Sequence, residues 1–409
     1  MLNDRLAQLT DYPFQRLAAL LDGIEPPAGL APISFSIGEP RHAPPAMVAE
    51  IVAAHAADWN RYPPTAGSPD LRAAIADWLA RRYALPPGMI DAERNILPVA
   101  GTREALFMAA LVCVPGHPGA ARTPAARPVV LAPNPLYQVY AGAAAMAGAE
   151  LHLMPATRET GFLPDLAAVP EKLLARTALA YFCSPSNPEG AVASAKQLAA
   201  ALDLARAHGF TLAFDQCYAD IYDRTPPPSI VETCAARDGD LEGVLVFHSL
   251  SKRSSVPGLR SGFVAGPETL IDPFKRLRAY GGATTPPPLM AAAAALWRDE
   301  THVAENRALY REKFDIADEV LDGRFGYRRP EAGFYLWLDV GDGEAAARKL
   351  WAEGALRVLP GAYLARGAGA ANPGRAYLRL SLVEAAPAVR EGLRRLVSVL
   401  SATDHGQRQ

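Results

Sequence analysis

Between about residues 95 and 266, short apolar runs alternate with longer stretches of helical character. The runs are VVLA (129–132), ALAYF (178–182), TLAF (211–214) and VLVFH (244–248), and helix candidates such as YQVYAGAAAMAG and AKQLAAALDLARAHG lie between them. A strand that is apolar along its whole length is typical of a sheet buried on both faces. The pattern therefore predicts an α/β fold with a mainly parallel central sheet covered by helices.

The chain also predicts a second, smaller domain. Its 409 residues exceed a usual single core. A long charged helical region, from about Met290 to Leu321, leads to alternating strands around GFYLWLDV and AYLRLSLV and to a final helix, VREGLRRLVSVL. This order is typical of an α+β domain, and the proline-rich stretch TTPPP (284–288) is the predicted hinge. The predicted boundaries are 1–45 for an N-terminal helix and segment of the small domain, 46–285 for the large domain, and 286–409 for the C-terminal small domain.

Charge and hydropathy exclude several classes of function. The formal net charge is −2 without a basic block, so nucleic-acid binding has no electrostatic support. No apolar run is long enough to span a bilayer. The first residues, MLNDRLAQLTDYPFQRLAALLDG, predict an amphipathic helix rather than a signal peptide, and hence a cytoplasmic protein.

Four cysteines are spread along the chain without a CxxC pair: Cys113, Cys183, Cys217 and Cys234. This spacing favours free thiols in a reducing compartment over disulfides or a metal site.

A polar or aromatic group follows each predicted strand. PNPLY follows the first, CSPSNPEG the second, DQCY the third and SLSKRSS the fourth. Because ligands of open parallel sheets bind beyond the carboxyl ends of the strands, these segments predict one shared site.

Asp215 and Lys252 are the first candidates within this site. A carboxylate at the tip of a buried strand needs a positive partner, although a helix cap or an arginine pair would serve equally well. A lysine after an apolar strand can act as a nucleophile through its neutral amine, although taken alone an exposed lysine is the better interpretation.

The two residues become informative together with Asn187, Tyr218 and Arg260. A lysine for an imine, an acid for a pyridinium nitrogen, hydroxyl and amide donors for a phenolate oxygen and an arginine for a phosphate describe a pyridoxal 5′-phosphate (PLP) site. Ser249 and Ser251 suit the phosphate as well.

Two further positions are weaker when considered alone. Gly101 and Thr102 precede an apolar-periodic helix, whose N-terminus suits a phosphate, although a plain helix cap explains them as well. Tyr137 follows a strand and would stack on a cofactor, although a lone tyrosine is more often part of a core.

The ordered set IGEP, RYPPTAG, GTREAL, NPLYQVY, SPSNPEG, DQCY, SLSKRSSVPGLRSGF and YLRLSL resembles the class I/II aminotransferases of PLP fold type I over nearly the whole chain. The resemblance implies Lys252 as Schiff-base and proton-shuttling residue, Asp215 as pyridinium partner, and Asn187 and Tyr218 at the phenolate oxygen. It implies Tyr137 as ring stack. Around the phosphate it implies Gly101, Thr102, Arg103, Ser249, Ser251 and Arg260.

The same resemblance implies residues for the substrate and for a partner subunit. Arg379 in YLRLSL matches the arginine that clamps the α-carboxylate, Gly38 in IGEP matches a segment over the substrate, and Asn187 borders the substrate too. Tyr62 in RYPPTAG matches a tyrosine that reaches the phosphate of the neighbouring subunit, which implies a homodimer with shared sites.

Several segments are similar to the proteobacterial succinyldiaminopimelate aminotransferases, among them VLPGAYLARGAGAANPGRAYLRLSLV. That subgroup implies transamination between N-succinyl-L,L-2,6-diaminopimelate and 2-oxoglutarate in lysine biosynthesis. Discrimination would then lie in a distal pocket, for which Ile37, Arg41 and the loop 280–288 are candidates.

Alternatives stay open at this point. A transaminase for aspartate, aromatic amino acids, methionine or acetylornithine would keep every cofactor residue and change the distal pocket. A PLP-dependent C–S lyase or decarboxylase would need no oxo-acid acceptor. A nicotinamide dehydrogenase would show G-x-G-x-x-G after its first strand, which is absent, and a regulator would need a DNA-binding domain before IGEP.

Overall fold

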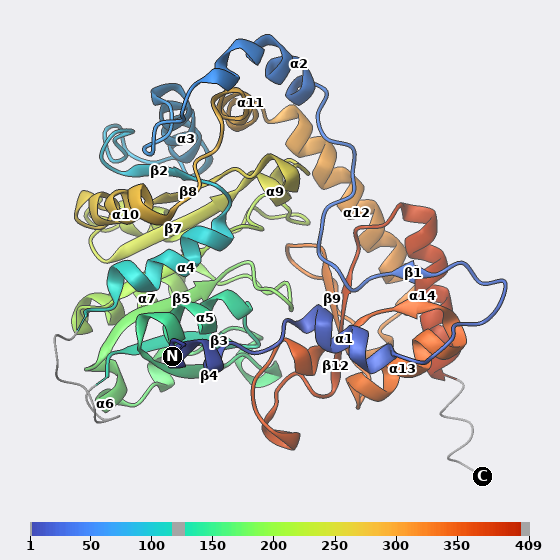
Figure 1. Cartoon of the computed structure of the whole chain (residues 1–409). Coiled ribbons are helices and arrows are strands. Elements are labelled where there is room, and N and C mark those ends of the chain that lie inside the picture. The colour runs from blue at the N-terminus through green and yellow to red at the C-terminus, as the bar shows by residue number, and fades with distance from the viewer. Residues whose placement is uncertain (1, 117–126, 402–409) are drawn as a thin grey trace.

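The computed structural model describes residues 2–116 and 127–401. The ends of the predicted domains 1–45 and 286–409, and residues 117–126 of the predicted domain 46–285, lie outside this range. A larger body is built around one sheet, and a smaller body carries β9, β12, α13 and α14 (Figure 1).

The described residues of the larger body form a seven-stranded sheet in the order β2-β8-β7-β6-β5-β3-β4. β8 runs antiparallel to both of its neighbours, β2 and β7, and the other neighbouring pairs of this sheet are parallel. The strands are β2 (Ile96–Val99), β3 (Val129–Asn134), β4 (Glu150–Pro155), β5 (Thr177–Cys183), β6 (Thr211–Asp215), β7 (Val244–Ser249) and β8 (Gly262–Ala265). The predicted α/β fold with a mainly parallel sheet is therefore confirmed.

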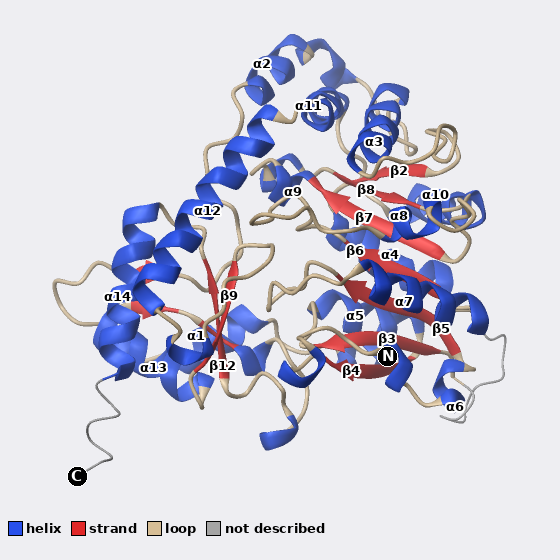
Figure 2. Cartoon of the chain, turned by 180° about the vertical axis from the view of Figure 1, so that it is seen from behind, coloured by secondary structure: helices blue, strands red, loops and turns tan. Residues whose placement is uncertain are grey.

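Each face of the sheet packs against its own group of helices. In β5, for example, Leu179 and Tyr181 belong to one apolar cluster, whereas Ala180 and Phe182 belong to the other. This alternation explains why the strands are apolar throughout. One face is covered by α4 (Thr102–Cys113), α5 (Gln138–Ala147) and α10 (Glu268–Gly281), and the opposite face by α3 (Pro69–Arg82), α7 (Ala195–His208) and α8 (Ile230–Ala235) (Figure 2).

The smaller body is an α+β unit, as the sequence predicts. Its three-stranded antiparallel sheet has the order β11-β12-β9, and β1 pairs with β10 beside it. The strands are β1 (Ile33–Ser34), β9 (Tyr335–Asp339), β10 (Leu356–Arg357), β11 (Leu359–Pro360) and β12 (Tyr377–Ser381). The helices that belong to it or lead into it are α1 (Pro13–Leu21), α12 (Thr301–Leu321), α13 (Gly343–Gly354) and α14 (Ala386–Ser401).

The helical region predicted from Met290 to Leu321 is two helices rather than one. The first, α11 (Pro287–Arg298), packs on α3 and on α2 (Met47–Ala54), and the second is α12. The prolines of TTPPP start α11, because proline at the first helical positions gives up no intrahelical hydrogen bond. The predicted boundary at 286 stays a prediction, although α11 itself shares the apolar cluster of the larger body.

The larger body also contains two short α-helices. They are α6 (Glu171–Leu174) and α9 (Leu250–Arg253). No helix within residues 2–116 and 127–401 combines the length and the apolar character that a membrane span requires. All four cysteines are free thiols, as predicted, and Cys183 and Cys234 are buried.

Trp297 on α11 is a direct test of this packing. Its buried ring lies 4.7 Å from the ring of Trp78 on α3 and 5.1 Å from the ring of Phe263 on β8, between centroids. We expect Trp297→Ala to lower the free energy of unfolding by about 3–5 kcal/mol, because it leaves a cavity in the core. Urea denaturation measures this change. Trp59→Ala is the matched control, since Trp59 is 53% exposed, and a similar loss in both variants would contradict the assignment.

Candidate active site

A cavity of about 540 Å³ lies at the carboxyl ends of the strands, between the large sheet and the small one. It brings together every residue predicted for the cofactor, the chemistry and the α-carboxylate except Tyr62. These lining residues are Gly38, Gly101, Thr102, Arg103, Tyr137, Asn187, Asp215, Tyr218, Ser249, Ser251, Lys252, Arg260 and Arg379.

Lys252 lies on the short helix α9, immediately after β7. Its Nζ donates a hydrogen bond to the carbonyl oxygen of Gly38 at 2.6 Å and lies 5.4 Å from the centroid of the Phe334 ring. Burial lowers the pKa of the Lys252 amine to about 8. A neutral, nucleophilic amine is therefore available at mildly alkaline pH.

Asp215 is the last residue of β6 and is 5% exposed. Its carboxylate accepts hydrogen bonds from Tyr140 Oη at 2.7 Å and from the Cys217 backbone N–H at 3.2 Å. Burial raises the pKa of this carboxyl, and it makes no ion pair with any described residue. A cationic ring nitrogen in the cavity would supply the positive charge that this carboxylate lacks.

Hydroxyl and amide groups lie on the same wall. The hydroxyls of Tyr218 and Tyr335 are 2.9 Å apart, and burial raises the pKa of both phenols. Asn187, in the loop after β5, accepts a hydrogen bond through Oδ1 from Arg379 Nη1 at 3.3 Å, which leaves its amide N–H groups as donors. These groups would suit a phenolate oxygen of a bound cofactor.

The N-terminus of α4 and Arg260 form a cradle that suits a phosphate. Gly101 precedes α4 with φ +89°, and a Cβ there would lie 2.2 Å from Arg260 Nη2, so only glycine leaves the space open. Arg260 donates to the carbonyl oxygens of Pro257 and Ala100, both at 2.9 Å. Ser249 caps α9 by accepting from the Ser251 N–H at 3.1 Å. The donor set of the cavity therefore fits PLP.

Arg379 lies on the central strand of the small sheet and is 4% exposed. Its Nη2 donates to the Ser36 carbonyl oxygen at 2.7 Å, its guanidinium lies 4.6 Å from the Tyr335 ring centroid, and its Nε is buried without a partner. It makes no ion pair among the described residues. A guanidinium in this state suits a planar carboxylate from a ligand.

Three other predicted positions lie elsewhere. Tyr62 is fully exposed and does not line the cavity. Arg41 pairs with Glu384, and residues 283–286 of the loop 280–288 line a separate cavity with Arg103 and Arg260. Of the candidates for a distal pocket, Ile37 lines the catalytic cavity. The roles proposed for Tyr62, Arg41 and the loop stay predictions.

Sequence reasoning missed Tyr140, Tyr335 and Cys217. Tyr140 lies three residues after Tyr137, so helical spacing places both on one face. Cys217 Sγ lies 3.1 Å from Thr102 Oγ1 and stands two residues after Asp215. Tyr335 comes from a strand 117 residues after Tyr218, and no local pattern links them.

A buried polar network behind Lys252 was also missed. Asn306 Nδ2 donates to the carbonyl oxygens of Lys252 and Arg253, both at 3.1 Å, so Asn306 Oδ1 is left to accept from His42 Nδ1 at 2.7 Å. His42 Nε2 must then accept from Lys313 Nζ, 2.6 Å away. Burial lowers the pKa of Lys313 to about 8. The network ties α9 to α12 and to the segment after Gly38.

The fold is that of the PLP-dependent transferases of fold type I. The model of the family described as aminotransferase class I and II matches residues 31–396, and the chain belongs to this family. Members of this family use PLP, which agrees with the donor set of the cavity.

Individual relatives cover nearly the whole chain. An LL-diaminopimelate aminotransferase of Desulforudis audaxviator is 34% identical over 96% of both chains. The crystal structure of an aminotransferase from Neisseria meningitidis is 40% identical, with a TM-score of 0.91, over 98% of this chain and all of that one. A probable N-succinyldiaminopimelate aminotransferase from Thermus thermophilus is 25% identical, with a TM-score of 0.81, over 95% of this chain and all of that one.

The lowered pKa of Lys252 gives a testable pH dependence. When the cofactor-free protein is mixed with PLP and reduced with borohydride, we expect labelling of Lys252 to rise with pH through a midpoint near 8, because only the neutral amine attacks. Peptide mapping by mass spectrometry separates Lys252 from the exposed Lys196, the internal reference. A Lys252 profile that coincides with that of Lys196 would contradict the effect of burial.

Proposed function

We propose that the protein transfers the α-amino group of N-succinyl-L,L-2,6-diaminopimelate to 2-oxoglutarate, forming glutamate. The observation that carries the aminotransferase chemistry is one cavity with a neutralisable lysine, a buried carboxylate lacking a cation and an arginine lacking an anion. The diaminopimelate-type substrate is supported by the names of relatives and by the segments shared with succinyldiaminopimelate aminotransferases.

Each residue has a role that follows from its position. Bound PLP supplies an electron sink for the carbanion that forms when the substrate Cα–H bond breaks. Asp215 would hold the cationic ring nitrogen, and Asn187 and Tyr218 would hold the phenolate oxygen. Lys252, once it is free, would take the proton from Cα and return it as a general acid.

Arg379 would bind the α-carboxylate through the two-pronged face of its guanidinium. Every amino donor and every oxo-acid acceptor of the reaction carries that carboxylate, so Arg379 would serve both half-reactions. The carbonyl oxygen of Gly38, which now accepts from Lys252, would hold the lysine amine whenever it is not bound to the cofactor.

A homodimer with shared sites belongs to this proposal. Tyr62 is fully exposed and does not line the cavity of its own subunit. A single exposed aromatic side chain is normal on a protein surface, so the homodimer is proposed from the family resemblance. Tyr62 would reach the phosphate of the neighbouring subunit, as the family resemblance implies.

One alternative substrate has its own support. The relative from Desulforudis audaxviator is named an LL-diaminopimelate aminotransferase, which favours the unsuccinylated amino acid as amino donor. Both substrates share the α-amino acid head and differ at the far end, so the catalytic residues would be the same.

A panel of half-reactions separates these substrates. We expect succinyldiaminopimelate to remove the visible absorbance of the PLP-loaded protein fastest, with glutamate as the second donor of the cycle. Acetylornithine, aspartate and phenylalanine complete the panel, followed by stopped-flow absorbance. A faster reaction with LL-diaminopimelate would transfer the assignment to the alternative, and a protein that reacts with aspartate alone would overturn both.

Arg379→Gln tests the shared carboxylate clamp. We expect the second-order rate constants of both half-reactions to fall roughly 100-fold, because a buried charge-assisted contact is lost. The control is Arg390→Gln, since Arg390 on α14 pairs with Glu319 on α12 and does not line the cavity. A loss confined to one half-reaction would contradict the clamp.

A further inference from the structure

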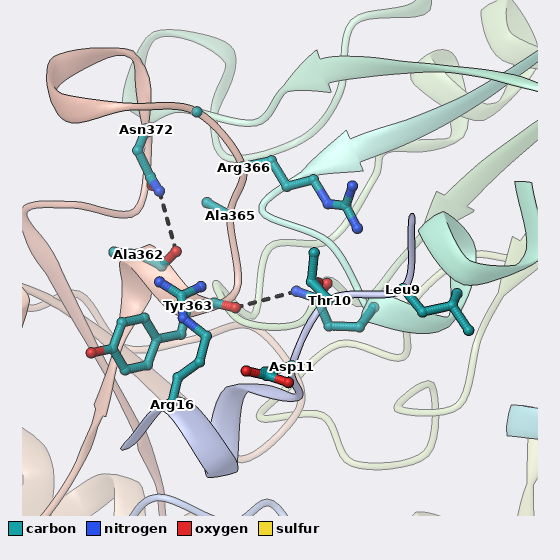
Figure 3. Close-up of a pocket in the computed structure, with 11 residues that line it drawn as sticks. Leu9, Thr10, Asp11, Arg16, Ala362, Tyr363, Ala365, Arg366 and Asn372 are labelled. Atoms are coloured by element: carbon teal, nitrogen blue, oxygen red, sulfur yellow. Dashed lines mark hydrogen bonds between the residues drawn. The ribbon is translucent and has the colours of Figure 1, made fainter. Parts of the chain in front are cut away.

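A second cavity, of about 630 Å³, opens beside the catalytic one (Figure 3). The two cavities share Gln138. They also divide one loop between them, since Tyr363 and Ala365 line the second cavity while Leu364 lines the catalytic one. In the N-terminal segment, residues 9–11 line the second cavity and residues 12–14 the catalytic one. The two cavities therefore adjoin at Gln138.

The loop that carries Arg366 is fixed to the carboxyl end of β3. Asn134, the last residue of β3, donates through Nδ2 to the Arg366 carbonyl oxygen and accepts through Oδ1 from the Arg366 N–H, both at 2.9 Å. The Leu136 N–H donates to the Leu364 carbonyl oxygen at 2.8 Å. The same segment that leads to Tyr137 thus fixes the backbone of Arg366, and its side chain extends toward Thr10 (Figure 3).

The guanidinium of Arg366 makes no ion pair or hydrogen bond with any described residue. It is half-buried, and burial lowers its pKa. Asn372, in the same cavity, is already engaged, since it donates to the Ala362 carbonyl oxygen and accepts from the Gly374 N–H. Arg366 is thus a fixed, partly desolvated cation without an anion, and an anionic ligand would offset the cost of its burial.

The other charged groups of the cavity are Arg16 and Asp11. The Arg16 guanidinium lies 3.9 Å from the centroid of the Tyr363 ring, in a cation–π contact. Asp11 is exposed and lies two residues before α1. Two cations and one anion leave the cavity with an excess of positive charge.

The geometry points to a binding site for the carboxylate at the far end of an elongated amino-acid substrate, held by Arg366, with Arg16 adding positive charge. This inference rests on the proposed aminotransferase function, because the α-carboxylate is placed at Arg379. Two guanidiniums, one in each cavity, would then bind carboxylates at the two ends of one substrate. The far end of succinyldiaminopimelate carries two carboxylates and no ammonium group, whereas the far end of free diaminopimelate carries one carboxylate and an ammonium group that would face Asp11.

Two probes of matched length test the site. Nε-succinyl-L-lysine and Nε-butyryl-L-lysine have the same number of acyl carbons and differ in a terminal carboxylate. With the PLP-loaded wild-type protein, we expect the second-order rate constant of the half-reaction to be roughly 10- to 100-fold higher for the succinyl probe, because a charge-assisted contact holds its tail. Arg366→Gln should reduce this ratio to near one and leave the butyryl rate within about twofold.

Control variants keep this test independent of folding. Arg366→Lys restores the charge without the fork and should give an intermediate ratio. Arg375→Gln should retain the wild-type ratio, because Arg375 pairs with Asp342 at 3.4 Å and lines the neighbouring cavity. Calorimetric titration of the cofactor-free protein with the succinyl probe should show weaker binding to Arg366→Gln than to wild type.

The outcomes separate this inference from the proposed function. Equal rates for the two probes in wild type, a preference retained in Arg366→Gln, or reaction with glutamate but with neither probe would overturn the tail site and leave the aminotransferase function standing. Failure of every amino donor, glutamate included, would overturn the proposed function itself. If free LL-diaminopimelate reacts faster than its succinyl form, and if Asp11→Asn removes this preference, the cavity binds a zwitterionic tail. That result would overturn the site for a carboxylate alone.

Discussion

The burial of Asp215 is the constraint on which the rest of the site depends. A carboxylate at the end of a strand that is covered on both faces loses its hydration, and the Tyr140 hydroxyl and the Cys217 N–H replace only part of it. Burial consequently raises its pKa. A protonated ring nitrogen of bound PLP would offset this effect, so the cofactor-free protein would be less favourable electrostatically than the protein with a pyridinium ring. Asp215 is therefore the residue whose electrostatics would favour binding of the cofactor.

The site is also the contact surface between the two sheets. Lys252 of the large body donates to the Gly38 carbonyl oxygen, Tyr218 meets Tyr335 of β9, and Asn187 meets Arg379 of β12. A Cβ on Gly38 would lie 2.2 Å from the Tyr335 hydroxyl, so glycine is required for this approach. In the proposed function, the large body would supply the groups that hold the cofactor and the small body the arginine that holds the substrate. Chemistry therefore depends on how closely the two bodies meet.

The sequence predicted the parts of this arrangement that follow from local rules. Strand ends of a parallel sheet converge, so Asp215, Asn187 and Lys252 were placed together by the apolar runs before them. It failed where the information is long-range: Tyr335 reaches the cavity, and His42 and Lys313 reach the network behind Lys252, through tertiary contacts without a local signature. The same limit explains why α11 was not predicted as a separate helix of the larger body, since composition alone does not reveal that Trp297 packs on Trp78. Tyr62 remains a prediction because its proposed target lies on another subunit.

Arginines that have a carboxylate partner within the chain differ in location from arginines that have none. Arg253 pairs with Asp220 at 2.9 Å, and Arg278 donates to the Pro98 carbonyl oxygen at 2.6 Å and approaches Glu104 at 3.5 Å. Their charges are compensated within the fold, as the cost of burying a guanidinium requires. Arg379 and Arg366 lack a carboxylate among the described residues, and each faces a cavity. Since both cavities are lined by Gln138, one molecule with two separated carboxylates would pair with both arginines at once if it occupied the proposed tail site.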